Sequence, residues 1–154
     1  MDIGLNITDR VRVRINEDLS ELQDQLENCG IPYSIPFKES VDGITREILI
    51  IDSYGVEIKT SGERITFIKT SNSKSNYVAQ IKDTKPLDAL NSIKSVLAEK
   101  FSCEEKSIKV NTFDIASYNS VMTIPMNNTA MAKLTLVMGT HGKIYLETIR
   151  MINK

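Results

Sequence analysis

The chain has 154 residues with 19 Lys and Arg against 20 Asp and Glu, so its formal net charge is −1. This balance excludes the strong overall field that draws proteins to nucleic acid or to a membrane surface. The hydrophobic fraction of 41% is enough for a core and too high for a disordered chain with balanced charges. The length suits one domain over residues 1–154.

The first predicted strand covers residues 8–15 and has two different faces, because the side chains of a strand point alternately to opposite sides. Its apolar face consists of Val11, Val13 and Ile15, and its basic face consists of Arg10, Arg12 and Arg14. The three arginines could bind phosphates or an acidic partner, or they could pair with nearby carboxylates on a solvated sheet face. They form the only compact basic set that the sequence predicts, and three phosphate contacts support only weak, salt-sensitive binding. We therefore expect no direct binding of nucleic acid at physiological salt.

A helix is predicted over residues 17–29, with Asn16 or Asp18 as its N-cap and Gly30 as its stop. Its buried stripe consists of Leu19, Leu22, Leu26 and Cys29. The outer surface carries carboxylates and no basic residue. The carboxylates that share one face, here called the acidic strip, are Asp18, Glu21, Asp24 and Glu27. Acidic groups suit the start of a helix but oppose its dipole near the end. The acidic strip is therefore either a plain solvated face or a docking surface for a protein with a basic surface, and we predict the second.

The middle of the chain predicts a loop followed by a meander of strands. Residues 31–43 contain Pro32, Pro36 and Gly43 and are predicted as an irregular loop. Strands are predicted over residues 46–51, 56–60 and 64–70, with turns between them. The polar segment over residues 71–76 is predicted as an exposed loop.

A second strand and helix are predicted at residues 77–82 and 86–101. Thr84 is a candidate N-cap, and Pro86 suits the first turn, where its missing N–H costs nothing. The predicted buried stripe consists of Leu87, Leu90, Ile93, Leu97 and Phe101. The remaining strands are predicted over residues 107–113, 120–125, 131–138 and 143–151, with the last two joined as a hairpin. One face of that hairpin is predicted to carry Leu134, Leu136 and Met138.

The order strand, helix, strands therefore occurs twice, over residues 8–70 and 76–151. This pseudo-duplicated unit predicts an α+β fold in which two helices pack on an antiparallel sheet. We expect both helices to lie on the same face of that sheet.

Residues that could carry catalysis are scarce. His141 is the only histidine, and it lies in a glycine-containing turn without a second ligand type nearby. A histidine-based metal site or a catalytic triad would therefore lack its partners. No glycine-rich phosphate loop occurs. We predict that the chain is not an enzyme and takes no metal and no cofactor.

The two cysteines and the hydropathy pattern indicate a compartment. Cys29 and Cys103 lack metal-ligand spacing, and we expect partly buried thiols in a reducing environment rather than a disulfide. The N-terminus lacks the basic-then-apolar pattern of a signal peptide. The longest aliphatic run, residues 48–51, is far shorter than a membrane span. We expect a cytoplasmic protein without membrane contact.

The segment Glu-Ile-Leu-Ile-Ile-Asp-Ser-Tyr-Gly-Val-Glu-Ile-Lys at residues 47–59 resembles part of a DNA sliding-clamp domain. Clamps carry a similar strand, a short turn with glycine and a returning strand after their first helix. Residues 78–81 leading into 87–90 resemble their second strand-to-helix passage, and residues 142–146 resemble their closing strand. The resemblance implies a clamp-like fold and a replication accessory role. Clamp helices, however, present Lys or Arg to DNA because phosphate neutralisation supplies the affinity, whereas the first helix here presents carboxylates.

The sequence therefore predicts a non-catalytic protein-binding module, an inhibitor or immunity-type protein whose acidic helix docks on a basic partner. The alternative is a clamp-like processivity protein that forms a ring by self-association and is therefore a homo-oligomer.

Overall fold

The computed structural model describes residues 1–71, 73–81 and 85–154, and it is an α+β structure with an antiparallel sheet. The helices are α1 (Leu19–Asn28), α2 (Ser73–Asn76) and α3 (Pro86–Lys100). The strands are β1 (Gly4–Asn6), β2 (Arg12–Arg14), β3 (Ser34–Val41), β4 (Ile44–Ile51), β5 (Val56–Ser61), β6 (Arg64–Thr70), β7 (Tyr77–Gln80), β8 (Lys109–Phe113), β9 (Ser120–Pro125), β10 (Ala130–Met138) and β11 (Lys143–Asn153). Single 3-10 turns occupy Asp52–Tyr54, Glu105–Ser107 and Thr140–Gly142.

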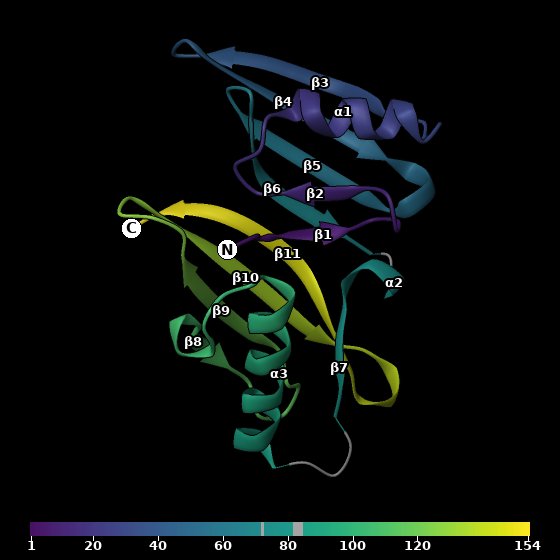
Figure 1. Cartoon of the computed structure of the whole chain (residues 1–154). Coiled ribbons are helices and arrows are strands. Elements are labelled where there is room, and N and C mark those ends of the chain that lie inside the picture. The colour runs from purple at the N-terminus through teal and green to yellow at the C-terminus, as the bar shows by residue number, and fades with distance from the viewer. Residues whose placement is uncertain (72, 82–84) are drawn as a thin grey trace.

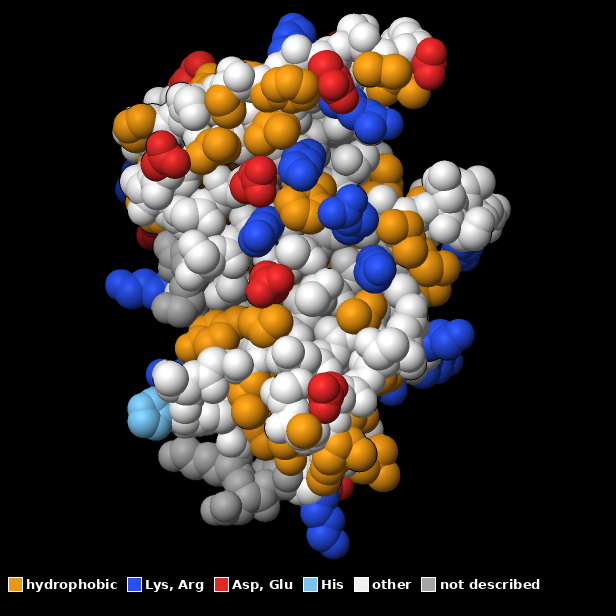
Figure 2. Space-filling model, turned by 180° about the vertical axis from the view of Figure 1, so that it is seen from behind, with side chains coloured by type: hydrophobic (Ala, Val, Ile, Leu, Met, Phe, Trp, Pro, Cys, Tyr) orange, Lys and Arg blue, Asp and Glu red, His pale blue; other side chains and the backbone are white. Residues whose placement is uncertain are grey.

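Nine strands form one sheet in the order β3-β4-β5-β6-β11-β10-β9-β8, with β7 also paired to β11. Strands β1 and β2 form a separate two-stranded ribbon. Figure 1 shows α1, this ribbon and α3 on one side of the large sheet, one after another along it. The opposite face of the sheet carries none of the helices that the structure describes and is the face seen in Figure 2.

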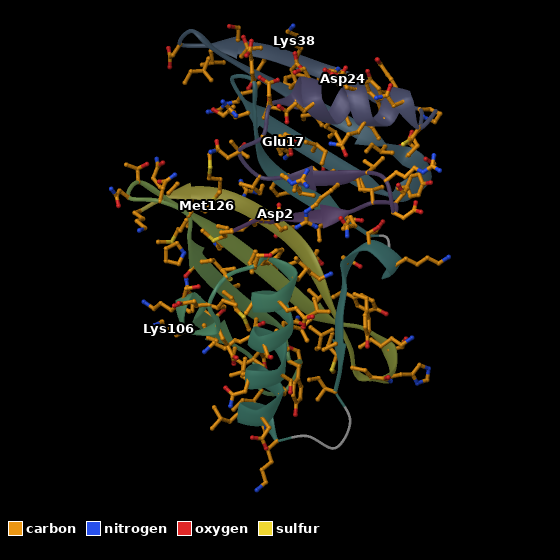
Figure 3. All side chains as sticks on the ribbon, in the orientation of Figure 1. Asp2, Glu17, Asp24, Lys38, Lys106 and Met126 are labelled. Carbon is orange, nitrogen blue, oxygen red and sulfur yellow. The ribbon has the colours of Figure 1, made fainter. Side chains whose placement is uncertain are left out.

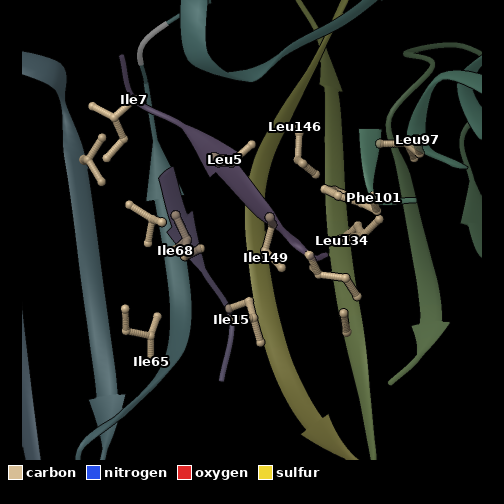
Figure 4. Close-up of a cluster of buried hydrophobic side chains, with 14 of the residues drawn as sticks. Leu5, Ile7, Ile15, Ile65, Ile68, Leu97, Phe101, Leu134, Leu146 and Ile149 are labelled. Carbon is tan, nitrogen blue, oxygen red and sulfur yellow. The ribbon is translucent and has the colours of Figure 1, made fainter. Parts of the chain in front are cut away.

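The core fills the space between the sheet and the elements that cover it. Leu22 and Leu26 of α1 and Ile93 and Leu97 of α3 are fully buried, as the 3.6-residue period of an amphipathic helix requires. Between the two helices, Leu5 of β1 lies over the junction of β6 with β11 (Figure 4). The buried residues form one continuous cluster that runs past this junction.

The predicted α+β class with an antiparallel sheet is confirmed, and β6 and β9 begin and end at the predicted residues. The prediction of only two helices is wrong, because α2 occupies part of the segment expected as an exposed loop. Ser75 and Asn76 of α2 are buried, and the Asn76 Nδ2 donates to the Thr70 carbonyl oxygen at 3.0 Å. The buried side-chain amide of Asn76 thus holds the helical turn of α2 against the end of β6.

The irregular loop predicted over residues 31–43 is also wrong, since most of it is β3. Pro36 is tolerated because β3 is an edge strand, where one side of the backbone needs no donor. The pairing register with β4 shifts between Ser34 and Phe37, where the proline lies. Asp42 and Gly43, with φ of 53° and 78°, make the tight turn into β4.

The stripe predicted for α3 is correct at Ile93, Leu97 and Phe101 but wrong at Leu87, which is 69% exposed, and Leu90 is only partly buried. Leu87 precedes Ile93 by six residues, which places it about 120° away around the helix. Ala89 takes the buried position instead. The candidate N-cap Thr84 lies outside the described residues. In the last hairpin Leu134 and Leu136 are buried as predicted, whereas Met138 is 37% exposed.

The strand predicted over residues 8–15 is shorter than expected, because only Arg12–Arg14 belong to β2. The Thr8 hydroxyl oxygen accepts the backbone N–H groups of Arg10 and Val11, each at 3.1 Å. Such a side-chain bond competes with strand pairing, so Arg10 lies in a bend rather than beside the other two arginines.

Candidate functional site

The N-terminus of α1 is fixed by Asp18, one of the two predicted caps. Its backbone is extended, and its Oδ1 accepts the Ser20 N–H at 3.0 Å and the Ser20 hydroxyl at 2.8 Å. These hydrogen bonds, the backbone one first, lower the pKa of the Asp18 carboxyl below its usual range. Asp18 therefore stabilises the start of the helix, and its charge is partly engaged by that role.

The orientation of α1 is set by its contact with the ribbon. The Gln25 Oε1 accepts the Arg12 N–H at 3.0 Å, and the Gln25 Nε2 donates to the Arg12 carbonyl oxygen at 3.2 Å. This pair, together with the buried leucines, turns the acidic strip outward. Asp24 lies on the outer side of α1, whereas Glu17 lies between α1 and the ribbon (Figure 3).

Three members of the acidic strip, Glu21, Asp24 and Glu27, are exposed, and Asp18 is half-buried. The Glu27 Oε1 accepts the Tyr33 hydroxyl at 2.9 Å, and this bond raises the pKa of Tyr33. Within the described residues, no cation forms an ion pair with Glu21 or Asp24. The middle of the strip is thus the part with uncompensated negative charge.

Glu17 lies just before α1 and behaves differently from the strip. Burial, the largest cause, and a hydrogen bond to Glu21 raise the pKa of Glu17 to about 7, although Arg14 opposes the shift. The Arg14 Nη1 lies 3.7 Å from the Glu17 Oε2. Near neutral pH, Glu17 therefore carries only part of a negative charge.

The predicted basic set of Arg10, Arg12 and Arg14 does not form one free surface. The Nε atoms of Arg12 and Arg14 each lie 3.1 Å from a carboxylate oxygen of Asp2. Arg12 also donates to the Asp2 carbonyl oxygen at 2.9 Å. The alternative in which arginines pair with nearby carboxylates therefore holds for Arg12 and Arg14, while Arg10 is exposed in its bend.

A second basic set, which the sequence did not predict, lies on the face of the sheet that carries no helix. We call it the basic sheet face, and it consists of Arg46, Lys59, Lys69, Lys133 and Arg150 around Phe67. Pairing aligns Lys59 with Phe67, Phe67 with Arg150, and Arg150 with Lys133 on four neighbouring strands. Figure 2 shows Lys and Arg side chains gathered over the middle of this face, with Asp and Glu side chains between and beside them.

Phe67 organises the basic sheet face. The Lys59 Nζ lies 5.0 Å and the Arg150 Cζ lies 4.7 Å from the centre of its ring, distances typical of cation–π contacts. The surface beside it is hollowed into a cavity of about 550 Å³, whose lining includes Phe37, Arg46 and Met151. No member of the basic sheet face forms an ion pair with a carboxylate in the part of the chain that is described.

A smaller hollow of about 480 Å³ lies between α1 and the β3–β4 hairpin. Lys38 lines it, but its Nζ lies 3.3 Å from the Glu47 Oε1 and is engaged there. This cation therefore leaves the acidic strip uncompensated.

Among the described residues, no three His, Cys, Asp or Glu side chains come together as a metal site. His141 is exposed in a turn with φ of 60°, and Cys29 and Cys103 are free, half-buried thiols. Over the same residues, the helices are too short or too polar to span a membrane.

The comparisons with known proteins leave the candidate surfaces to be interpreted from this chain alone. No protein-family model matches it, and neither the curated proteins nor the solved structures gave a match.

Proposed function

We propose that the protein is a non-catalytic protein-binding module, of the inhibitor or immunity type, that docks the acidic strip on a partner with a basic surface. The observation that carries this proposal is the uncompensated charge of Glu21 and Asp24 at the centre of the outer face of α1. Two cations near α1 are engaged elsewhere, Arg14 by Asp2 and Glu17 and Lys38 by Glu47.

Repulsion between the carboxylates of the acidic strip costs free energy, and this cost favours a binding role for the strip. Like charges three or four residues apart destabilise a helix by roughly 0.2–0.5 kcal/mol per pair. A lysine within the strip would remove that cost, and the helix has none. Complementary charge on a partner would offset the repulsion and would accelerate the encounter of the two proteins.

The wild-type protein is first used to purify a binding partner from the source organism. The test then compares how fast the wild type and its variants associate with that partner. We expect Glu21→Gln/Asp24→Asn to slow association by about tenfold or more in low salt, because the steering charges are lost. The difference should shrink above about 150 mM salt. Asp88→Asn/Glu99→Gln is the matched control, since it removes two exposed carboxylates from α3 instead. Unchanged association by a folded Glu21→Gln/Asp24→Asn protein would refute the proposal.

The alternative function is a clamp-like replication accessory protein that forms a ring by self-association. It is supported by the element order, in which a strand, a helix and four strands occur twice, and by the placement of α1 and α3 on one side of the sheet. The same order supports the pseudo-duplicated unit. The end strands β3 and β8 offer open edges through which copies could pair.

The clamp-like alternative predicts different experimental results from docking through α1. A ring held by strand edges stays multimeric when the acidic strip is neutralised, and it is retained on circular but not on linear DNA. We expect no such retention, because the strip would repel phosphates and the exposed carboxylates Asp88 and Glu99 lie on α3. The two free thiols support a reducing, cytoplasmic location.

A further inference from the structure

We infer that the basic sheet face is the docking site for the acidic strip of a second copy of this chain, so that copies associate head to tail. The inference rests on the proposed function, because it uses the same strip and names its partner. Although the total charge is only −1, the described part of the chain carries a negative cluster on α1 and a positive cluster on the sheet face, and neither contains an ion pair. The strip and the basic sheet face cannot meet within one copy, because they lie on opposite sides of the same sheet (Figures 1 and 2).

The two surfaces have matching dimensions. Successive carboxylates of the strip are three residues apart, which is a rise of about 4.5 Å along a helix. Neighbouring strands are separated by about 4.8 Å. Arg150 of β11 and Lys133 of β10, which lie opposite each other, are therefore about as far apart as Glu21 and Asp24 of the strip. A helix that lies across the strands can place Glu21 and Asp24, about 60° apart around its axis, over this pair of cations.

The composition of the basic sheet face favours a protein over a nucleic acid. Aromatic residues, methionine and arginine are enriched in protein interfaces, and Phe37, Met151 and Arg150 line its hollow. Stacking of a base needs an open aromatic ring, whereas Phe67 is 6% exposed and covered by Lys59 and Arg150.

The contact is heterologous, because one surface of each copy meets a different surface of the next. Such contacts add copies until a ring closes or the material is exhausted. Association should therefore increase with protein concentration and decrease with salt. This mode differs from pairing of strand edges, which depends on backbone hydrogen bonds.

The experiment uses sedimentation of the full chain over a concentration series at about 50 mM and about 500 mM salt, which change the screening length severalfold. One variant reverses the strip, Glu21→Lys/Asp24→Lys, and the other reverses the sheet face, Lys59→Glu/Arg150→Glu. The matched control is Arg10→Glu/Lys85→Glu, which reverses two exposed cations outside the basic sheet face. Circular dichroism establishes that each variant is folded.

We expect the wild type and the control to associate in low salt. Each reversed variant alone should bind itself at least about tenfold more weakly, because like charges then face each other. An equal mixture of the two reversed variants should associate again, since each supplies the surface that the other lacks. Recovery in the mixture also excludes misfolding as the reason for the loss.

Several outcomes would overturn the inference. A wild type that stays monomeric at millimolar concentration in low salt would do so, as would folded reversed variants that remain monomeric when mixed. Association that ignores both reversals would instead favour the strand edges. Retention of single-stranded nucleic acid by a monomeric wild type, lost in Lys59→Glu/Arg150→Glu, would reassign the face to a polyanion. In each case Glu21→Gln/Asp24→Asn tests separately whether the strip docks on another basic partner. Failure of self-association can therefore be distinguished from failure of the proposed function.

Discussion

The carboxyl of Glu17 is largely buried, and its two charged neighbours shift its pKa in opposite directions. Its side chain is 16% exposed, Arg14 lies close on one side, and Glu21 shares a hydrogen bond with it. Desolvation outweighs the attraction of the arginine, so the protonated form is favoured. This residue links the fold to the strip, because its proton determines how much negative charge Glu21 faces.

The shift predicts how stability depends on pH. The folded-state pKa of about 7 lies above the ordinary value of 4.5, so the native chain holds this proton more tightly than the unfolded chain. The stabilisation is fully present below about pH 4.5 and is lost as the pH rises through about 7. Glu17→Gln imitates the protonated form, and its free energy of unfolding should not show this loss.

The measurement is denaturant unfolding of both proteins at several pH values between 4.5 and 8. The wild type should lose stability relative to Glu17→Gln across that window. Glu99→Gln, at an exposed position of α3, serves as the control and should follow the wild type. Parallel profiles for wild type and Glu17→Gln would show that Glu17 titrates at its ordinary pKa.

At the scale of elements, α1, α3 and the inner strands could be predicted from periodicity, whereas α2, β3 and the basic sheet face could not. Pro36 reads as a strand breaker unless the strand is known to lie at an edge. The signal for this hairpin is the dipeptide Asp42-Gly43, which is typical of a two-residue hairpin turn. The basic sheet face requires the strand order: Lys59 and Lys133 are far apart in the chain and share a row only because β6 and β11 pair.

The β3–β4 hairpin gives a direct test at this scale. Gly43 has φ of 78°, and a Cβ there would meet no atom within 4 Å, so only the backbone conformation opposes a side chain. We expect Gly43→Ala to lower the free energy of unfolding by about 1–2 kcal/mol, the cost of a left-handed residue. Gly43→Asn should cost less, because asparagine tolerates this region. Equal losses for the two variants, measured by chemical denaturation, would mean that the turn has another conformation.

At the scale of the whole molecule, the segment that contains the ribbon connects the end of α3 with β6. The Asp2 N–H donates to the Phe101 carbonyl oxygen at 2.8 Å at the end of α3, and the Asn16 N–H donates to the Ile65 carbonyl oxygen at 2.7 Å in β6. Ile68 and Ile149 pair across the central junction, and both are fully buried. The segment before α1 thus contacts both ends of the core.

This continuity leads us to expect one cooperative unfolding transition for the whole chain. Leu26 in α1 and Leu97 in α3 are both fully buried in the same cluster. Leu26→Ala and Leu97→Ala should each lower the free energy of unfolding by about 2–5 kcal/mol. Each should also weaken the hydrogen-exchange protection of amides in both helices. Leu87→Ala is the control, because its side chain is 69% exposed and its loss should stay within about 0.5 kcal/mol. If each core variant reduced protection only in its own half, the chain would consist of two units that unfold separately, and the ribbon would connect them without coupling them.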